Sequence, residues 1–218
     1  MHRIQDGQWL AYSTDASTGR LPTGTIIGIE EAVEGQVWLA TNEGEVCRFD
    51  PEAIECIEYY KDEAGMPSPP YTDLTTQADG SLVVGTDGAG LGTFDGATWR
   101  TQTIDGEFLA DNSVWDMVQT RDGFLWIAVD SGLQQMDPNR PAIQRLYTFA
   151  EGSLPIDEVR VLNIDGGGLW IGGQGAAQQQ DDEWQIYSLD NGLAGSTVQA
   201  LAVDDQLRTW LGTESGLS

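Results

Sequence analysis

Residues 167–173 read Gly-Gly-Leu-Trp-Ile-Gly-Gly, which is a turn followed by an apolar strand that ends in small residues. Four other segments share this pattern at spacings of 40–45 residues: residues 35–41 (Gly-Gln-Val-Trp-Leu-Ala-Thr), 80–86 (Gly-Ser-Leu-Val-Val-Gly-Thr), 123–129 (Gly-Phe-Leu-Trp-Ile-Ala-Val) and 207–213 (Leu-Arg-Thr-Trp-Leu-Gly-Thr). Five such segments at near-constant spacing indicate structural repeats. The repeats centre near Trp38, Val83, Trp126, Trp170 and Trp210.

Each repeat has room for four short strands and little else. An apolar strand precedes the central segment, as at residues 26–32 and 114–120, and Asp-Gly pairs such as Asp79-Gly80 supply the positive φ that tight hairpins need. The central strand is apolar on both faces, which is typical of a sheet packed between two others. It ends in a small residue that would let neighbouring sheets approach closely: Ala40, Gly85, Ala128, Gly172 and Gly212.

These features predict an all-β fold: a five-bladed β-propeller of four-stranded antiparallel blades, in a single domain over residues 1–218. Residues 216–218 resemble the start of a third strand, and residues 1–9 resemble a third strand, a turn and a fourth strand. We therefore predict that the N- and C-terminal strands share one blade and close the ring. The alternative is that the chain is a part of a longer propeller.

The chain is strongly acidic, with 35 Asp and Glu residues against 10 Lys and Arg and a net charge of −25. Such a surface repels phosphate backbones and favours cations or a basic partner, so we expect no nucleic-acid binding. The alternative is that the acidity only keeps a Trp-rich protein soluble. The sequence contains no run of 18 apolar residues, so we expect no membrane insertion. The first six residues lack the apolar region of a signal peptide. The chain is thus either cytoplasmic or the mature or excised part of an exported protein.

Loops between second and third strands are expected at one end of a propeller axis. They carry Glu43, Asp87, Asp130 and Glu214 at positions that we align, with Gln174 in the fourth repeat. Four carboxylates around a channel mouth could bind a hard cation such as Ca²⁺. The alternative is that acidic residues beside glycines serve only turns and solubility.

Loops between fourth and first strands are expected at the same end, and they are the longest and least alike: residues 13–23, 61–71, 104–113 and 149–156. Variation on one face predicts a binding surface. Met66, Tyr71, Phe108 and Leu109 are our candidates for contacts with a protein partner or a glycan. Alternatively, these side chains fold under their own loops.

Few residues suggest catalysis. His2 is the only histidine, which argues against Ser-His-Asp, Cys-His and multi-histidine metal designs. A pair of carboxylates could still act as in glycosidases, but nothing selects two among 35. We therefore predict that the chain is not an enzyme and name no catalytic residue.

The two cysteines offer a marker of compartment. A turn at residues 50–53 would place Phe49 opposite Ile54, and hence Cys47 opposite Cys56, within reach of a disulfide. We expect a bridge if the protein is exported and two buried thiols if it is cytoplasmic.

Residues 190–204 and 209–217 resemble the two-component regulator propeller repeat, with its Asn-Gly-Leu, its central Leu-Trp-Ile-Gly-Thr and its final Gly-Leu, and residues 122–137 resemble it too. The resemblance implies an extracytoplasmic sensor region, often joined to a membrane-bound kinase, that reads carbohydrates or other small ligands. We therefore predict a noncatalytic, sensor-like module that binds a ligand or protein through variable loops on one face. The alternatives are a structural or scaffold subunit of a larger complex and a carboxylate-dependent carbohydrate-active enzyme.

Overall fold

The computed structural model describes residues 2–5, 8–12, 21–138, 140–165, 168–180, 183–204, 206 and 208–218. The chain divides into two compact units, Met1–Thr101 (unit 1) and Gln102–Ser218 (unit 2). Within the described ranges the elements are strands and three short 3-10 helices, η1 (Val33–Gly35), η2 (Ile104–Gly106) and η3 (Leu189–Asn191). None of these one-turn helices could cross a membrane.

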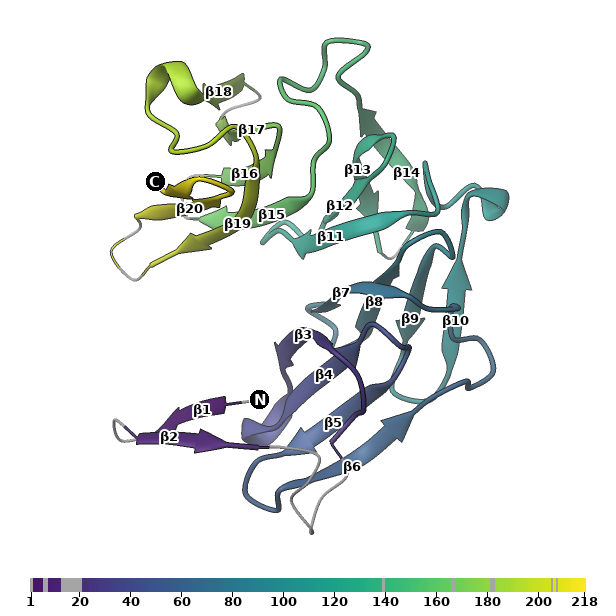
Figure 1. Ribbon diagram of the computed structural model, residues 1–218. Helices are drawn as coiled ribbons and strands as arrows, with labels where there is room; N and C mark the ends of the chain where they lie inside the picture. Colours follow the sequence, from purple (N-terminus) through teal and green to yellow (C-terminus); the bar gives the residue numbers. More distant parts are fainter. Residues whose placement is uncertain are drawn as a thin grey trace. The chain divides into compact units, whose positions relative to one another are not determined.

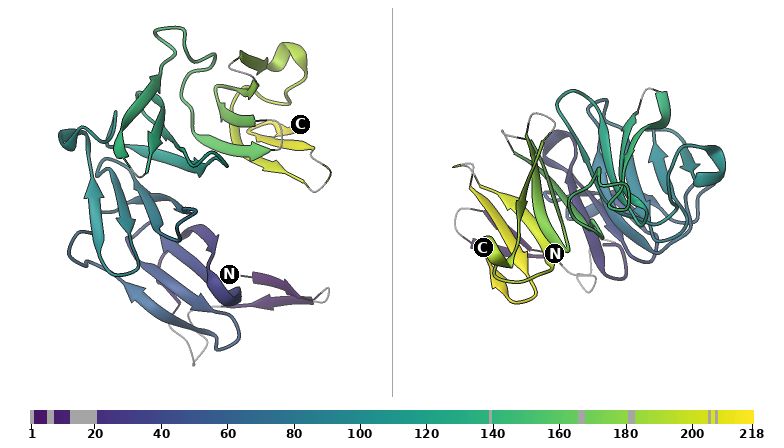
Figure 2. Two further views of the ribbon diagram at one scale, coloured as in Figure 1. Left: turned by 180° about the vertical axis from the view of Figure 1, so that it is seen from behind. Right: turned by 90° about the horizontal axis from the view of Figure 1, so that it is seen from above.

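Unit 1 contains a hairpin followed by two four-stranded sheets (Figure 1). The hairpin pairs β1 (His2–Gln5) with β2 (Gln8–Ala11). The first sheet comprises β3 (Ile26–Glu31), β4 (Val37–Thr41), β5 (Val46–Asp50) and β6 (Glu55–Tyr60). The second comprises β7 (Tyr71–Thr76), β8 (Leu82–Thr86), β9 (Leu91–Phe94) and β10 (Trp99–Gln102). Seen from behind, in the left view of Figure 2, the strands of each of these sheets lie side by side.

Unit 2 contains two further four-stranded sheets and one three-stranded sheet. They comprise β11 (Val114–Gln119), β12 (Leu125–Val129), β13 (Gly132–Asp137) and β14 (Arg140–Tyr147); β15 (Val161–Asp165), β16 (Gly168–Gly173), β17 (Gly175–Gln180) and β18 (Glu183–Tyr187); and β19 (Val198–Val203), β20 (Thr209–Thr213) and β21 (Gly216–Leu217). Within each sheet, strands that are consecutive in the sequence pair antiparallel.

The predicted fold class is therefore confirmed: the chain is all-β, with antiparallel blades of a five-bladed β-propeller, one for each sequence repeat. The last repeat supplies three strands, β19 to β21, within unit 2. A blade shared by the two chain ends, and one domain over the whole chain, both concern how the two units meet. They stay predictions.

The central strands are buried on both faces, as their continuous apolar character predicts. Every residue of β8 and β12 is buried. Neighbouring blades approach closely where the sequence has no side chain. A Cβ atom on Gly28 would lie 2.6 Å from the Cβ atom of Leu74 in the next blade, and one on Gly172 would lie 2.8 Å from Cγ1 of Val198. Gly172, the small residue at the end of the central strand in the fourth repeat, thus lets the neighbouring sheets approach closely, as predicted.

Cys47 and Cys56 form a disulfide, with their Cα atoms 5.7 Å apart. The predicted register was wrong, because Cys56 lies opposite Phe49 while Cys47 lies opposite Tyr59. The loop lies one residue later than predicted: it covers residues 51–54 instead of 50–53, and Ile54 within it has a φ of 58°. A register shift also falls between Arg48 and Phe49. The cysteines are therefore diagonal neighbours, and the bridge packs beside buried Phe49.

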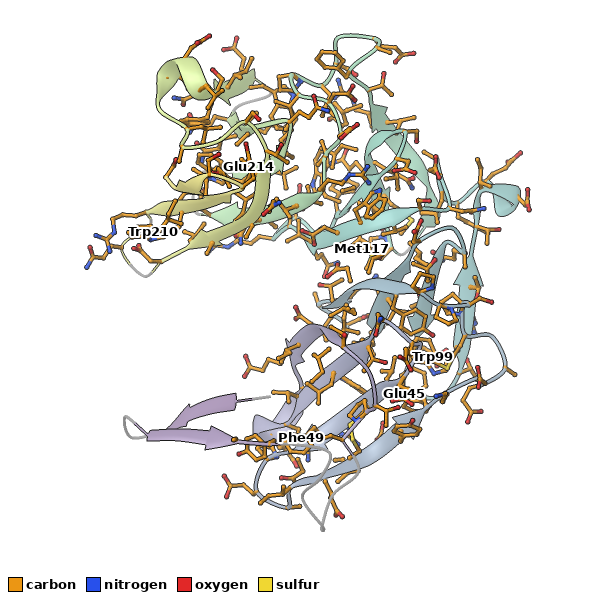
Figure 3. The ribbon with its side chains drawn as sticks, viewed as in Figure 1. Glu45, Phe49, Trp99, Met117, Trp210 and Glu214 are labelled. Atoms are coloured by element: carbon orange, nitrogen blue, oxygen red, sulfur yellow. A yellow bond between two sulfur atoms is a disulfide. The ribbon has the colours of Figure 1, made fainter. Side chains whose placement is uncertain are left out.

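Glu45, labelled in Figure 3, is a buried carboxylate whose side chain is only 2% exposed. It accepts hydrogen bonds from the backbone N–H of Thr23, from the Thr23 hydroxyl at 2.8 Å and from Nζ of Lys61 at 2.8 Å. Burial alone would raise the pKa of Glu45. The hydrogen bonds from Lys61, Thr23 and Tyr59 together outweigh burial and hold the pKa below its ordinary value of 4.5.

This lowered pKa predicts an acid-sensitive contribution to stability. A carboxyl whose pKa is lower in the folded state stabilises the fold above its unfolded pKa, and this contribution is lost as the pH falls through the folded pKa. In Glu45→Gln, urea unfolding should show a smaller loss of the free energy of unfolding between pH 7 and pH about 3 than in the wild type. The exposed Glu55→Gln variant is the control, and equal acid sensitivity of Glu45→Gln and the wild type would refute the role of Glu45.

Candidate functional site

Three loops of unit 2, which follow the fourth strands β10, β14 and β18, begin with the same backbone turn. The backbone N–H groups of Glu107, Gly152 and Gly192 donate to the carbonyls of Ile104, Phe149 and Leu189 at 2.9, 3.0 and 3.4 Å, respectively. The three donor residues have positive φ values of 61°, 71° and 117°. A left-handed residue closes each turn, so the chain reverses immediately after the strand.

This turn exposes one apolar side chain in each loop and buries another. Ile104, Phe149 and Leu189, which we call the apolar tips, are 46%, 53% and 58% exposed. One or two residues after the left-handed position come the anchor leucines, Leu109, Leu154 and Leu193, which are all buried. Each loop is thus fixed by a leucine underneath and presents an apolar residue to solvent.

Two adjacent hollows lie beside two of the tips. The first has a volume of about 360 Å³ and is lined by Phe149, Ile186 and Tyr187, among others. The second has a volume of about 350 Å³ and is lined by Leu189 and Asp190, among others. Both hollows share Gln174, Gly175 and Ser188. Ile186 is itself 49% exposed, so three large apolar side chains border the pair of hollows.

The backbone around the hollows is held by hydrogen bonds. The N–H of Gly175 donates to the carbonyl of Ser196 at 2.8 Å, and Gln174 forms a β-bridge with Thr197. Glu214, labelled in Figure 3, accepts hydrogen bonds at 2.8 Å from the backbone N–H groups of Ser196 and Thr197. These hydrogen bonds hold the pKa of Glu214 below its usual value, and the bond from Thr197 contributes most. A surface fixed in this way is pre-organised for binding.

The backbone hydrogen bonds show which residues of the second-to-third loops are equivalent. After the second strand of each blade, one backbone N–H donates to the carbonyl that precedes the first strand: Asn42, Asp87, Asp130, Gln174 and Glu214 donate to Thr25, Pro70, Ser113, Asp157 and Thr197. The residue aligned with Asp87 is therefore Asn42, and our alignment of Glu43 was wrong by one residue.

Asp130 pairs with Arg160 at 3.1 Å and accepts a hydrogen bond from Nε1 of Trp115 at 2.8 Å. Glu214 is bound to the backbone as described above. Among the residues that the structure describes, no three His, Cys, Asp or Glu side chains gather as metal ligands do. A calcium site built from Glu43, Asp87, Asp130 and Glu214 would need both units and stays a prediction.

The predicted contact residues divide into two groups. Tyr71 and Leu109 are buried, so they take the alternative role of folding under their loops. The hydroxyl of Tyr71 donates to the carbonyl of Pro67 at 3.2 Å, and Leu109 is an anchor leucine. Met66 packs half-buried against the core of unit 1, and Phe108 is half-buried beside Leu109. Binding by Met66 and Phe108 stays a prediction.

The loop 149–156 was predicted as part of the binding surface, but Phe149, Ile186 and the other two tips were not. A signal was present: in each of the three loops the fourth strand is followed by Ser or Thr and then by an apolar residue, as in Thr103-Ile104, Thr148-Phe149 and Ser188-Leu189. The same pattern is interrupted in unit 1, where Lys61 and Asp62 follow β6.

Part of the chain matches a family model, and the whole fold is similar to that of solved structures. Residues 109–131 match the model of the two component regulator propeller family. No curated protein matches the chain. A similar solved structure is the extracellular domain of a putative hybrid two component system from B. thetaiotaomicron, with a TM-score of 0.75 and 21% identity over 92% of this chain and 29% of that one.

Two other similar structures have different roles. Virginiamycin B lyase from Staphylococcus aureus matches with a TM-score of 0.64 and 14% identity over 94% of this chain and 70% of that one. YCF48 bound to D1 peptide matches with a TM-score of 0.66 and 18% identity over 96% of this chain and 67% of that one. At such identities the likeness shows the fold alone, and the fold does not determine the function.

Proposed function

We propose that this chain is a noncatalytic binding module of a sensor-like protein and that it binds a partner protein. The premise is the two-component regulator propeller repeat that residues 109–131 match. The binding surface is the pair of hollows on unit 2 with its bordering side chains Phe149, Ile186 and Leu189. One observation carries the proposal: the same loop turn exposes an apolar residue in every fourth-to-first loop of unit 2.

Burial of these side chains would supply the driving force. An apolar patch with a polar rim is typical of a surface that binds another protein, and an aromatic anchor often contributes most of the affinity. Phe149 is such an anchor, and Asp157 and Asp190 contribute acidic groups to the rim. With a net charge of −25, the chain would attract a partner with a basic face.

Two findings support an extracytoplasmic location. The disulfide between Cys47 and Cys56 belongs to an oxidising compartment, because cytosolic thiols are normally kept reduced. The similar sensor structure is an extracellular domain, of which this chain covers 29%. The similar structure with a bound peptide supports a peptide-binding use of the fold.

A glycan is the second candidate ligand. Phe149 and Tyr187 line the same hollow, and an aromatic ring can stack on a sugar. The larger apolar contribution of Ile186 and Leu189 favours a protein, since aliphatic side chains offer a sugar no comparable stacking surface.

Replacing Phe149 by serine should weaken binding by about 10- to 30-fold, as expected on loss of an aromatic anchor. A displayed peptide library is selected on the immobilised chain, and the dissociation constant of an enriched peptide is measured for the wild type and for Phe149→Ser. Ile57→Ser is the matched control, because Ile57 is 39% exposed on β6 and lines neither hollow. Equal binding to wild type and Phe149→Ser would contradict the proposal, and so would saturable binding of oligosaccharides with no peptide enriched.

A further inference from the structure

A group of three side chains joins the two four-stranded sheets of unit 2. Trp115 is the second residue of β11, Asp130 directly follows β12 in the same sheet, and Arg160 directly precedes β15 of the next sheet. All three belong to unit 2. None of them lines either hollow of the proposed binding surface, so the group is a separate feature of the molecule.

Irregularities of the β-bulge kind place two of these side chains. The register between β11 and β12 shifts at Trp115. The backbone N–H of Arg160 donates to the carbonyl of Gly172 at 2.8 Å, and Val161 also lies opposite Gly172, so two residues face one. An extra residue of this kind bends the strand and takes its side chain out of the regular alternation. Trp115 and Arg160 thus occupy comparable positions in neighbouring sheets, where their side chains meet.

The three side chains hold one another in place. The guanidinium of Arg160 lies 3.9 Å from the centroid of the Trp115 ring. Its Nη1 pairs with Oδ1 of Asp130 at 3.1 Å, and Nε1 of Trp115 donates to the same oxygen at 2.8 Å. The side chains of Arg160 and Asp130 are 35% and 47% exposed, so both remain accessible. The orientation of the guanidinium is therefore fixed before any ligand binds.

Part of this group is unused within the described part of the chain. Among those residues the Arg160 side chain donates only through Nη1, which leaves Nε and Nη2 as free donors. Both hydrogen bonds to the Asp130 side chain end on Oδ1, so Oδ2 accepts none from the described residues. The Nε–Nη2 edge of a guanidinium matches the two oxygens of a carboxylate, and a free carboxylate oxygen accepts from an ammonium group.

The same three residue types meet a second time in unit 2, with a different result. Oδ2 of Asp204 accepts hydrogen bonds from Nε of Arg208 at 2.7 Å and from Nε1 of Trp210 at 3.0 Å. Its Oδ1 accepts from the backbone N–H groups of Gln206 and Arg208, each at 2.9 Å. Both oxygens of Asp204 are therefore used to close the turn between β19 and β20. The group at Arg160 instead keeps a donor edge and an acceptor free.

We propose that Arg160 and Asp130 bind a small zwitterion, a free amino acid. Its carboxylate would accept from Nε and Nη2 of Arg160, and its ammonium group would donate to Oδ2 of Asp130. Charge favours this class: a plain anion would meet Asp130 and the net charge of −25, and a plain cation would meet the guanidinium. The two ligand charges can be one carbon apart, as in an α-amino acid, or further apart, as in an ω-amino acid, and the test distinguishes these sources.

The indole N–H of Trp115 reports on the site directly, because it donates to Asp130. Its resonance is assigned in the ¹⁵N-labelled chain by comparison with Trp115→Phe and followed during titration with glycine and with 4-aminobutyrate. We expect saturable shifts with at least one of them, and the tighter ligand identifies the charge separation. Binding should be about 10- to 100-fold weaker in Arg160→Gln, the scale of lost hydrogen bonds between charged groups.

Variants and ligand derivatives complete the test. Arg208→Gln removes the same charge from the other group and should change binding less than about twofold, since distant charges are screened. Arg160→Lys keeps the charge without the two-donor edge and should restore only part of the affinity. The N-acetyl and the amide derivatives of the tighter amino acid lack the ammonium and the carboxylate, and each should bind at least about 10-fold more weakly.

The proposal is overturned if neither titration saturates, if either derivative binds as tightly as its parent amino acid, or if Arg160→Gln and Arg208→Gln weaken binding equally. Should Arg160→Gln fail to fold, the ligand series on the wild-type chain decides alone.

Discussion

Replacing Leu109 by alanine is expected to lower the free energy of unfolding by about 2–5 kcal/mol, the usual cost of truncating a buried leucine. Leu109 is 1% exposed and fixes the loop that begins at Ile104. The backbone N–H of the next residue, Ala110, donates to the side chain of buried Gln134 at 2.8 Å, so the loop cannot easily collapse into the space left by the substitution. The loss should therefore lie well above the scatter of surface substitutions.

The matched control is Ile104→Ala in the same loop, which should change the free energy of unfolding by less than about 0.5 kcal/mol because Ile104 is exposed. Urea unfolding followed by tryptophan fluorescence measures both variants. If Leu109→Ala were as stable as Ile104→Ala, Leu109 would not be the anchor of this loop.

The second large effect is expected from Gly172→Ala. The added Cβ atom would lie 2.7 Å from Cγ2 of Val161 and 2.8 Å from Cγ1 of Val198, closer than carbon atoms pack. Val161 belongs to the same sheet and Val198 to the next one, so relief requires the two sheets to move apart. We expect a loss of about 1–3 kcal/mol, the range for an overpacked core.

Gly212→Ala provides the comparison, because Gly212 occupies the same position in the last repeat and its added Cβ atom would meet only Ala200, at 3.4 Å. That variant should remain within about 0.5 kcal/mol of the wild type. Thermal unfolding of the two variants decides the matter, and equal melting temperatures would mean that close approach at Gly172 does not limit the packing of the sheets.

The regular part of the fold could be predicted because its signals are local. The first strand of the first sheet, expected at 26–32, runs over Ile26–Glu31, and that of the third, expected at 114–120, runs over Val114–Gln119. Turn residues and apolar runs recur in each repeat, so each strand is specified by its own neighbours in the sequence. In the fourth repeat the first strand begins at Val161, after Glu158 with a φ of 50°.

The candidate site was less accessible to sequence reasoning. Whether Leu109 or Phe149 faces solvent depends on which neighbouring sheet each loop packs against, and that contact is distant in the sequence. The error at Glu43 was one of alignment, because Glu43 lies five residues after Trp38 whereas Asp87 lies four after Val83. The hydrogen bond from Asn42 to Thr25 identifies the equivalent residue. The cysteine register failed because the loop lies one residue later than predicted, which places Cys56 opposite Phe49, and because a register shift then places Cys47 opposite Tyr59. Alternation along a strand carries no sign of such a shift.

The most direct test of the proposed binding surface is hydrogen–deuterium exchange of the chain with and without a peptide enriched on it. Binding at the paired hollows predicts slower exchange in residues 149–157 and 186–196, with the strands of unit 1 unchanged. Slower exchange confined to other segments, or no change anywhere at saturating peptide, would contradict a binding site formed by Phe149, Ile186 and Leu189.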